Sequence, residues 1–598
     1  MKKFSPATYI FALLSPQDRL AASKLVLAML ITAIIDVMGV ASILPFMALA
    51  AKPEIVQTNS WMQQIYVLGG FASPNRFLFF AGAIFFLLLV ASNFFSALTA
   101  WMMFRFAFSL EHRFAERMLK SYLSRPYEFF LAGNTSIMAR NILTECATAV
   151  GGAVVPGLQL LARSVVVFFV LILLMAVDPA LALVVALVLG GAYAGAYLFI
   201  RRKLLANGRR SNDANAEAHK AATEALHGVK EIRLAGMEKA FLSRFSAASL
   251  DNSHFKVKGF TLSLLPRYVI ETVAFGGMLL ILLYLIGVKR DVTNALPLIA
   301  LYALAGYRLL PALQQIFQSL SQIRYSFASL EVLNRELAGE VAGQELEEAS
   351  QQLEVGRGIE LLGVSYAYPG TGAPVLHDIS LSIAANTSVA LVGATGSGKT
   401  TLLDIVSGIL LPGSGEIRID GRKLDANVMR EWQASIGYVP QSIYLTDDTI
   451  ARNIAFGCAG DNIRMEDVER AAKAAKLHEF ITAELPDGYA TLVGERGVRL
   501  SGGQRQRIGI ARALYRKPGM LIMDEATSAL DGITERAVID AIQELSHKLT
   551  IITVAHRLTT VRDCDVIYLL DKGHVAFRGS FAELSASNDI FQNMLNPR

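Results

Sequence analysis

The sequence is 598 residues long, which exceeds one ordinary domain and provides for two or three separate cores. Hydrophobic residues make up 53% and charged residues 18%, a balance that suits a chain partly in a membrane and partly in water. The net charge of +5 gives no indication of a nucleic-acid partner, and the 3 cysteines lack the spacing of a disulfide framework or a metal site.

Six apolar stretches in the first half of the chain are long enough to cross a bilayer, which takes roughly 20 helical residues. They are 22–49, 77–100, 154–177, 180–200, 268–288 and 295–318. The first resembles a signal peptide in part, but its apolar core is longer than a signal sequence needs and further stretches follow it. No such stretch occurs beyond Arg335, so the sequence predicts an α-helical, six-span membrane domain over 1–335.

Lysine and arginine residues concentrate in two of the loops between these stretches. The loops 102–153 and 201–266 are rich in both residue types, whereas the turn at Asp178 and Pro179 contains neither. By the positive-inside rule, both termini and the two long loops are predicted to be cytosolic.

The first long loop contains a helical pattern. Its apolar residues recur every four positions, with charged residues between them, as an amphipathic helix in water requires. They are Phe106, Leu110, Phe114, Met118 and Tyr122. The pattern predicts that the membrane helix continues into the cytosol, either as an ordinary surface helix or as a rod that transmits force.

Residues 336–358 are rich in Glu, Gln and Gly, which is typical of a linker. A second, soluble domain is therefore expected over 359–598.

The second domain contains a sequence pattern that is typical of phosphate-binding loops. The segment 388–392 reads as a buried strand, and a glycine-rich loop follows it and leads into a helix. The residues expected to surround a nucleotide are Gly393, Ala394, Thr395, Gly396, Ser397, Gly398, Lys399, Thr400 and Thr401. In this pattern backbone amides surround phosphate oxygens, Lys399 reaches the β- and γ-phosphates, and Thr400 ligates Mg²⁺.

A second strand, 520–523, ends in two acids. Asp524 would support the Mg²⁺ shell, and Glu525 is placed to polarise the attacking water. An apolar strand ending in a carboxylate is common by itself, but its combination with a phosphate loop predicts a nucleotide hydrolase.

The segment Leu500 to Gln504 reads Leu-Ser-Gly-Gly-Gln and precedes a predicted helix over 505–515. Here the chain resembles the ABC ATPase family, whose signature motif this segment matches in full. The resemblance covers 359–585 and implies an α/β P-loop ABC ATPase domain. It also implies that Ser501, Gly502, Gly503 and Gln504 cap the γ-phosphate held by a partner domain.

The resemblance implies roles for four more residues. Tyr368 resembles the aromatic residue that stacks on adenine, and Gln441 resembles the glutamine that links Mg²⁺ to the membrane domain. Asp531 resembles the aspartate at the dimer contact. His556 follows the strand 551–554 and resembles the histidine that contacts the γ-phosphate, which makes it a catalytic residue together with Glu525.

One phosphate loop and one signature per chain require two chains for complete sites. A homodimer is the economical interpretation, and a heterodimer with a similar half would also satisfy this requirement.

The spanning segments argue against a soluble ABC ATPase. An importer would usually keep the two domains on separate chains. The segments 491–497 and 224–233 resemble the loop and the cytosolic extension that contact each other in exporters. ATP and Mg²⁺ are the expected cofactors.

The substrate is less well indicated. The stretch from Asp36 to Phe46 resembles bacterial lipid-linked oligosaccharide flippases, which implies a lipid-linked substrate, membrane lipids as surroundings and the bacterial inner membrane as location. A drug, peptide or other lipid exporter has the same architecture.

The apolar spans also contain charged residues. Placing a charged side chain inside the bilayer costs about 2.5–3.5 kcal/mol unless it forms an ion pair or faces water. The charged residues are Asp36, Arg163, Glu271 and Arg308. We expect these residues to face the bundle interior, either as mutual ion pairs or, for Asp36, Arg163 and Arg308, as a site for an anionic headgroup.

Overall fold

The computed structural model describes residues 13–52, 54, 56, 60–284, 292–338, 351–458, 462–494, 497–525, 536, 538–539, 542, 544, 548–555 and 561–595. Contacts divide the chain into two units. The membrane unit comprises Met1–Arg125 and Asn134–Gln344, and the ATPase unit comprises Pro126–Gly133 and Glu345–Arg598.

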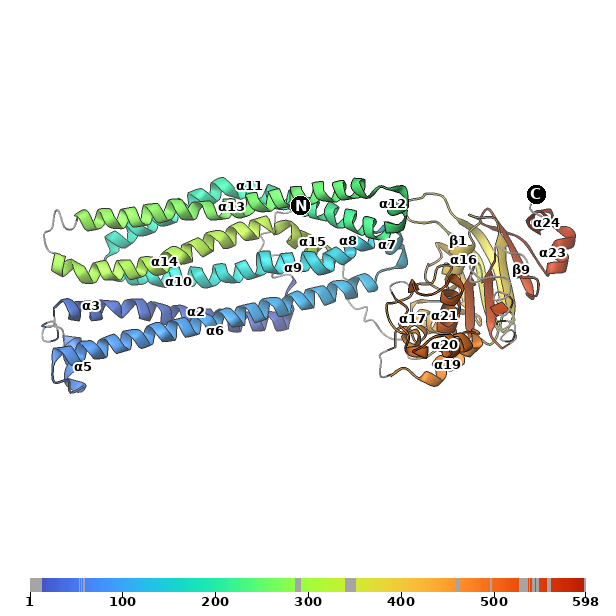
Figure 1. Ribbon diagram of the computed structural model, residues 1–598, viewed down its shortest axis with the longest axis horizontal. Coiled ribbons are helices and arrows are strands. Elements are labelled where there is room, and N and C mark those ends of the chain that lie inside the picture. Colours follow the sequence, from blue (N-terminus) through green and yellow to red (C-terminus); the bar gives the residue numbers. More distant parts are fainter. Residues whose placement is uncertain are drawn as a thin grey trace. The chain divides into compact units, whose positions relative to one another are not determined.

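The membrane unit is helical, and Figure 1 shows its long helices side by side. Its helices are α2 (Pro16–Ala41), α3 (Ile43–Ala51), α5 (Ser60–Leu68), α6 (Pro74–Leu123), α8 (Thr135–Arg140), α9 (Cys146–Ala149), α10 (Val155–Val177), α11 (Pro179–His227), α12 (Val229–Ala235), α13 (Glu238–Tyr284), α14 (Val292–Tyr325) and α15 (Phe327–Ala338). Two π-helical segments, η1 (Asn141–Glu145) and η2 (Val150–Val154), flank α9.

Four helical stretches of the described residues are long and apolar enough to cross a membrane. They are Pro16–Ala50, Pro74–Leu123, Thr135–Val177 and Ala182–His227. The last two predicted spans fall in α13 and α14, which are not among the four, and 285–291 lie outside the described residues. The helical membrane domain is thus observed, and the count of six spans stays a prediction.

The first predicted span is two helices instead of one. The chain breaks at Ser42 between α2 and α3, and the Ser42 hydroxyl donates to the carbonyl oxygen of Gly39. Pro45 follows three residues later; it has no amide hydrogen for the carbonyl of Ala41, and its ring disfavours a continuous helix there.

The predicted amphipathic helix is confirmed as the second half of α6. Leu110, Phe114, Met118 and Tyr122 are all buried on one face, as the four-residue spacing requires. The helix runs without interruption from the apolar half into this charged half, so the extension is rigidly continuous with a candidate span.

The ATPase unit contains two sheets. The four-stranded antiparallel sheet has the order β2-β1-β4-β5, and the six-stranded sheet has the order β10-β9-β3-β8-β7-β6. The strands are β1 (Gly358–Tyr366), β2 (Leu376–Ala384), β3 (Ser388–Gly393), β4 (Ser414–Ile419), β5 (Arg422–Lys423), β6 (Ile436–Val439), β7 (Met520–Asp524), β8 (Thr550–Val554), β9 (Val566–Asp571) and β10 (His574–Gly579). Except for antiparallel β10, the larger sheet is parallel.

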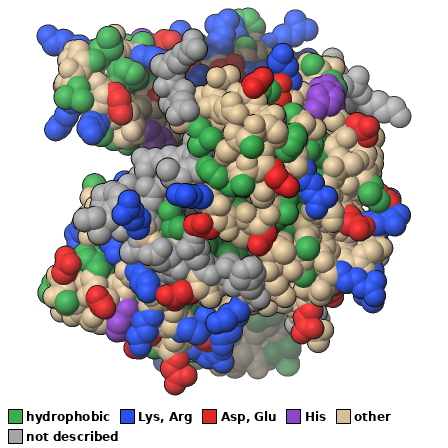
Figure 2. Space-filling model, turned by 90° about the vertical axis from the view of Figure 1, so that its right-hand side faces the viewer, with side chains coloured by type: hydrophobic (Ala, Val, Ile, Leu, Met, Phe, Trp, Pro, Cys, Tyr) green, Lys and Arg blue, Asp and Glu red, His purple; other side chains and the backbone are tan. Residues whose placement is uncertain are grey.

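The ATPase unit also contains helices. They are α7 (Tyr127–Ala132), α16 (Lys399–Val406), α17 (Ala426–Ala434), α18 (Ile450–Ile454), α19 (Met465–Ala474), α20 (His478–Glu484), α21 (Gly502–Tyr515), α23 (Phe581–Ser587) and α24 (Asp589–Leu595), with a 3-10 turn at Gly488–Ala490. On the face drawn in Figure 2, Lys and Arg side chains are intermixed with Asp and Glu, and hydrophobic side chains occur in small groups. Such a mixed surface suits contact with water.

Candidate functional site

The phosphate loop leaves β3 and turns sharply into α16. Its glycines have φ angles of +157° at Gly393, +83° at Gly396 and +99° at Gly398, which residues with side chains rarely adopt. A Cβ atom at Gly393 would also lie 2.2 Å from the carbonyl oxygen of Leu570. The loop can therefore fold tightly ahead of the positive N-terminal end of α16.

Lys399 is the first residue of α16, and only 6% of it is exposed. Its ammonium donates to the carbonyl oxygens of Gly393 and Ala394, each at 2.9 Å. Burial lowers the pKa of Lys399, while the nearby carboxylates of Glu525 and Asp524 oppose that shift. The backbone carbonyl groups of the loop thus hold the lysine side chain inside the loop.

One hydroxyl of the loop is buried without a protein partner. Ser397 Oγ has no hydrogen-bond acceptor or donor among the described residues, although Ser397 is 3% exposed. A buried polar atom in this position costs free energy unless a ligand or water satisfies it. Together with the buried Lys399, it suits an anionic ligand.

The two acids lie at the same edge of the sheet as the loop. Asp524 ends β7 and pairs with Val554 of β8, which in turn pairs with Leu391 of β3, so all three strands point their carboxyl ends to one edge. Asp524 is 6% exposed. Oxygen ligands such as its carboxylate, the Thr400 hydroxyl and the Gln441 amide oxygen are those that Mg²⁺ prefers.

Glu525 and Gln441 are in direct contact. Gln441 Nε2 donates to Glu525 Oε2 at 2.6 Å, and the Glu525 amide donates to the carbonyl oxygen of Val554 at 3.1 Å. Glu525 has a φ of +51°, unusual for a residue with a side chain. The bond from Gln441 therefore orients the carboxylate, and the bond to Val554 fixes the backbone of Glu525.

Tyr368 lies beside the N-terminal turn of α16. Its hydroxyl is 3.0 Å from Thr401 Oγ1, and its ring meets Tyr366 edge to face at 5.2 Å. The side chain is half-buried. The structure thus brings Tyr368 next to the phosphate loop.

Sequence reasoning missed Asp404, an acid on an otherwise apolar helical turn of α16. Burial, and then the charge of Asp524, raise the pKa of Asp404 to about 6. The same carboxyl contributes to raised pKa values of Tyr366 and Tyr438, which burial mainly causes. An acid in place of an apolar residue on the buried side of that helix was the available signal.

The signature segment forms the start of α21. The Gln504 amide donates to Ser501 Oγ at 3.2 Å, and the Ser501 amide donates to Gln504 Oε1 at 2.8 Å, which is a complete capping box. Ser501 is exposed. In the part of the chain that the structure describes, no hydrogen bond joins 500–504 to the chain's own phosphate loop.

The last turn of α21 is anchored by Arg512, which sequence reasoning also missed. Its guanidinium donates to Asn453 O at 2.8 Å, Tyr444 O at 2.7 Å and Asn453 Oδ1 at 3.1 Å, and it lies 4.6 Å from the Phe456 ring centre. Burial lowers the pKa of Arg512 to about 10. The signature helix is thereby fixed to the segment that follows Gln441.

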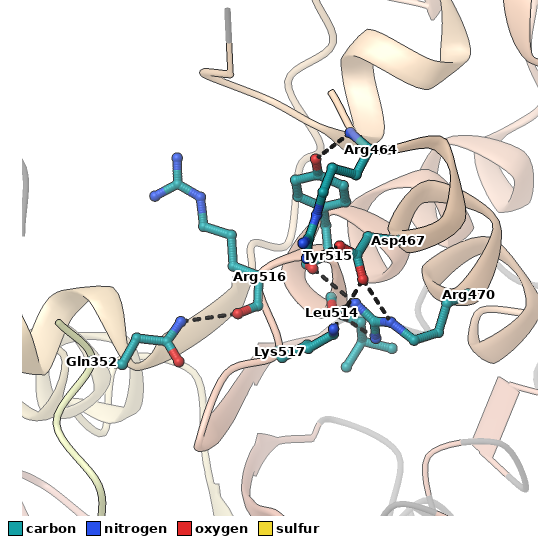
Figure 3. A network of polar contacts seen from close by, with 8 residues as sticks. All are labelled: Gln352, Arg464, Asp467, Arg470, Leu514, Tyr515, Arg516 and Lys517. Atoms are coloured by element: carbon teal, nitrogen blue, oxygen red, sulfur yellow. Dashed lines mark hydrogen bonds and ion pairs between the residues drawn. The ribbon is translucent and has the colours of Figure 1, made fainter. Parts of the chain in front are cut away.

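The end of α21 is held by a charged network (Figure 3). Arg470 Nη2 donates to the carbonyl oxygen of Tyr515 at 2.9 Å, and Lys517 pairs with Asp467 at 3.0 Å. Hydrogen bonds from Lys517 and Arg464 lower the pKa of Asp467 to about 2. Cations near the last carbonyls stabilise a helix end.

Several predicted residues lie outside the described part of the chain. They are Asp531 and His556, and also Glu495 and Arg496 of the segment 491–497. Their predicted roles stay predictions.

Two of the charged residues in the apolar spans form an ion pair. Arg308 Nη1 of α14 lies 3.3 Å from Asp36 Oδ1 of α2, and Arg308 Nη2 donates to Ser92 Oγ of α6 at 3.2 Å. Ser92 Oγ also contacts Asp36 Oδ1. The expected interior position therefore holds for this pair.

The other two charged residues lie elsewhere. Arg163 is exposed on the surface of the single chain, and Glu271 is 38% exposed and pairs with Arg267 at 2.8 Å. The expected interior position is therefore not seen for either residue in the single chain.

Comparison with known proteins agrees with this geometry. The family model described as "ABC transporter" matches 376–528, and the one described as "ABC transporter transmembrane region" matches 23–307. A protein of Pseudomonas fluorescens named ATP-dependent lipid A-core flippase is 32% identical over 81% of this chain and 80% of its own length. One of the same name from Pseudomonas aeruginosa is 34% identical over 66% of this chain and 64% of its own length.

Among solved structures, a bacterial Atm1-family ABC exporter with ATP bound has the same fold. It superposes with a TM-score of 0.79 and 25% sequence identity, over 96% of this chain and 97% of that one. Both the membrane unit and the ATPase unit therefore have counterparts in a single exporter chain.

Proposed function

This chain belongs to the ABC transporter family as an exporter-type half-transporter, and from that premise we propose that it hydrolyses ATP to move an amphipathic lipid across a membrane. The observation that carries the hydrolytic part is the hydrogen bond between Gln441 and Glu525 at the strand edge beside the phosphate loop. It holds a carboxylate where it would polarise a water next to a bound γ-phosphate.

ATP would bind against Tyr368 and the loop Gly393–Thr401, with Lys399 at the β- and γ-phosphates. The oxygen atoms of Thr400, Gln441 and Asp524 would hold Mg²⁺, which neutralises phosphate charge when bound. Glu525 would take the proton of the attacking water, and His556 would contact the γ-phosphate.

Two chains would form the complete sites. The exposed Ser501 and the N-terminal end of α21 would face the nucleotide of the partner, and Asp531 would contribute to that contact. A homodimer satisfies this requirement most simply.

The substrate would be a lipid with an anionic headgroup. The relatives named lipid A-core flippases support a lipid, and the first-helix resemblance supports a lipid-linked oligosaccharide. With Arg308 paired to Asp36, the exposed Arg163 is the better candidate for a headgroup contact. Six spans, cytosolic termini and a bacterial inner membrane complete the proposal.

The test is flipping in proteoliposomes that contain the purified full-length chain. A polyprenyl-pyrophosphate glycan, a lipid A glycolipid and a cationic drug would be compared, each with wild type and with Glu525→Gln as the inactive control. ATP-dependent movement of either lipid supports the proposal. Movement of the drug alone would replace it with a drug exporter, and ATP hydrolysis that no lipid stimulates would contradict the lipid substrate.

A further inference from the structure

A buried polar cluster lies where the chain leaves α6 and returns in α8. The intervening segment, Pro126–Gly133, groups with the ATPase unit, so the cluster lies near both ends of that segment. Asn141 Nδ2 donates to Tyr122 Oη at 3.1 Å and thereby joins the leaving arm to the returning arm. Both residues are at most 4% exposed.

The returning arm is tied in turn to α11. Arg140 Nη1 lies 3.4 Å from Glu145 Oε1, and Asn212 bonds to both, with its Nδ2 donating to Glu145 at 3.2 Å and its Oδ1 accepting from Arg140 at 3.1 Å. The side chains of Arg140 and Glu145 are 9% and 3% exposed. Such a buried pair keeps its geometry, because separating the two side chains would leave a buried charge without a counter-ion.

The leaving arm is tied to α15. Arg125 Nη2 lies 3.5 Å from the Glu336 carboxylate and donates to the Glu336 carbonyl oxygen at 3.2 Å, while its guanidinium lies over the Tyr122 ring at 5.3 Å. Glu336 lies in the last turn of α15, which ends at Ala338. Arg335 Nε also lies 3.4 Å from Glu336 Oε1, on the exposed side of α15.

The first of the two π-helical segments lies inside this cluster. η1 contains Asn141 and Glu145, and η2 follows after one turn of α-helix. A π turn holds one residue more than an α turn, and absorbing it rotates the rest of the helix by about 100° and shifts it by about 1.5 Å. Such segments let a helix change register without unfolding.

We propose that Tyr122, Arg125, Arg140, Asn141, Glu145, Asn212 and Glu336 form a clamp that transmits ATP-driven movement into the membrane unit. The clamp makes the ends of α6, α8 and α15 and the interior of α11 around Asn212 move as one body when 126–133 is displaced, and η1 and η2 absorb the movement as a register change. These are positioning residues, and the inference rests on the proposed function.

The experiment uses the full-length chain in lipid nanodiscs. Hydrogen exchange of peptides from 60–100 and 155–177 is measured with and without ATP and vanadate, together with the ATPase KM and kcat and the melting temperature. The variants are Tyr122→Phe, Glu145→Gln and the charge exchange Arg140→Glu with Glu145→Arg. The control is Glu331→Gln, which breaks an exposed 3.5 Å pair between Glu331 of α15 and Arg209 of α11, outside the clamp.

Wild type and Glu331→Gln should show the same ATP-dependent exchange difference. Tyr122→Phe and Glu145→Gln should keep KM and kcat near wild type but reduce that difference by about tenfold, within the range of coupling between distant sites. The charge exchange should restore it relative to Glu145→Gln.

Unchanged exchange differences in both single variants would overturn the clamp. A parallel fall of melting temperature and ATPase rate in Tyr122→Phe would also overturn it, because that is the signature of simple destabilisation. Wild type that hydrolyses no ATP would instead refute the proposed function, and the clamp with it.

Discussion

Glu525 shows how neighbouring side chains define a single residue. Its carboxylate accepts from Gln441, and its backbone is fixed to β8 at a left-handed φ. The side chain therefore cannot rotate freely away from the phosphate loop.

We expect Glu525→Gln to retain ATP binding and to lose hydrolysis by about a hundredfold or more, because an amide can accept the bond from Gln441 but cannot take a proton. Binding of a fluorescent ATP analogue and phosphate release would be measured on the full-length chain. Glu469→Gln, which alters an exposed pair with Lys473, is the control and should behave as wild type. Near-normal hydrolysis in Glu525→Gln would rule out this residue as the base.

The raised pKa of Asp404 predicts a pH effect. Its ordinary pKa is 3.8 and its folded pKa is about 6, so the folded chain binds the proton more tightly and stability falls as pH rises through that interval. Asp404→Asn should raise the free energy of unfolding by about 1–2 kcal/mol above pH 6, after allowance for partial exposure, and by nothing below pH 4. Thermal unfolding followed by fluorescence of the buried Trp432 measures this, and a less stable variant at pH 7 would contradict it.

At the scale of elements, α21 combines a structural role with a proposed functional role. Its capping box stabilises the helix, and in the proposed dimer its exposed N-terminal end would face the partner's nucleotide. A second capping box, Ser580 with Glu583 at the start of α23, has the same structure outside the nucleotide site.

Ser501→Ala and Ser580→Ala should each cost about 1 kcal/mol of stability, because each removes one helix cap. Only Ser501→Ala should reduce ATP hydrolysis, by about tenfold or more, since a group that contacts the γ-phosphate contributes to the transition state. Melting temperature and ATPase rate would be compared for both. Equal ATPase rates would show that Ser501 only caps its helix.

Three membrane helices meet at the Asp36 and Arg308 pair. Arg308→Gln should destabilise the membrane unit by about 3–5 kcal/mol because it leaves Asp36 charged and buried. The double variant Asp36→Asn with Arg308→Gln should recover most of that loss. Yield and melting temperature in detergent are the measurements, and Arg163→Gln is the exposed-arginine control. If Arg308→Gln were as stable as wild type but lost stimulation by a polyprenyl-pyrophosphate glycan, the headgroup reading would replace the structural one.

At the scale of the whole molecule, the proposed dimer would complete each nucleotide site with the phosphate loop of one chain and the signature segment of the other. In the dimer proposed above, a Lys399→Ala chain mixed with a Ser501→Arg chain places both lesions in one site and leaves the other whole. Neither homodimer should hydrolyse ATP, and the mixture should recover part of the activity.

The measurement is ATPase activity of purified mixed dimers that carry two different affinity tags. An inactive mixture would indicate that the two sites hydrolyse only together. Full activity of the isolated ATPase unit at high dilution would contradict the shared sites.

Patterns local in sequence predicted much of this molecule. The strand before Gly393, the helix after Lys399, the acids after Met523 and the buried face of α6 follow from periodicity, glycine conformation and strand ends. The break at Ser42 was not predicted, because an apolar run long enough to span a membrane masks a proline near its end.

The sequence by itself therefore determined the ABC family, the two kinds of domain and the residues of the phosphate loop and signature, since each depends on neighbours within a few positions. Only the tertiary structure decided which distant polar groups meet: Arg308 with Asp36, Gln441 with Glu525, and Tyr122 with Asn141. Such pairs depend on the rotation and register of packed helices and strands. A hydrophobic pattern specifies which face is buried but leaves open which polar side chain of one buried face meets which on another.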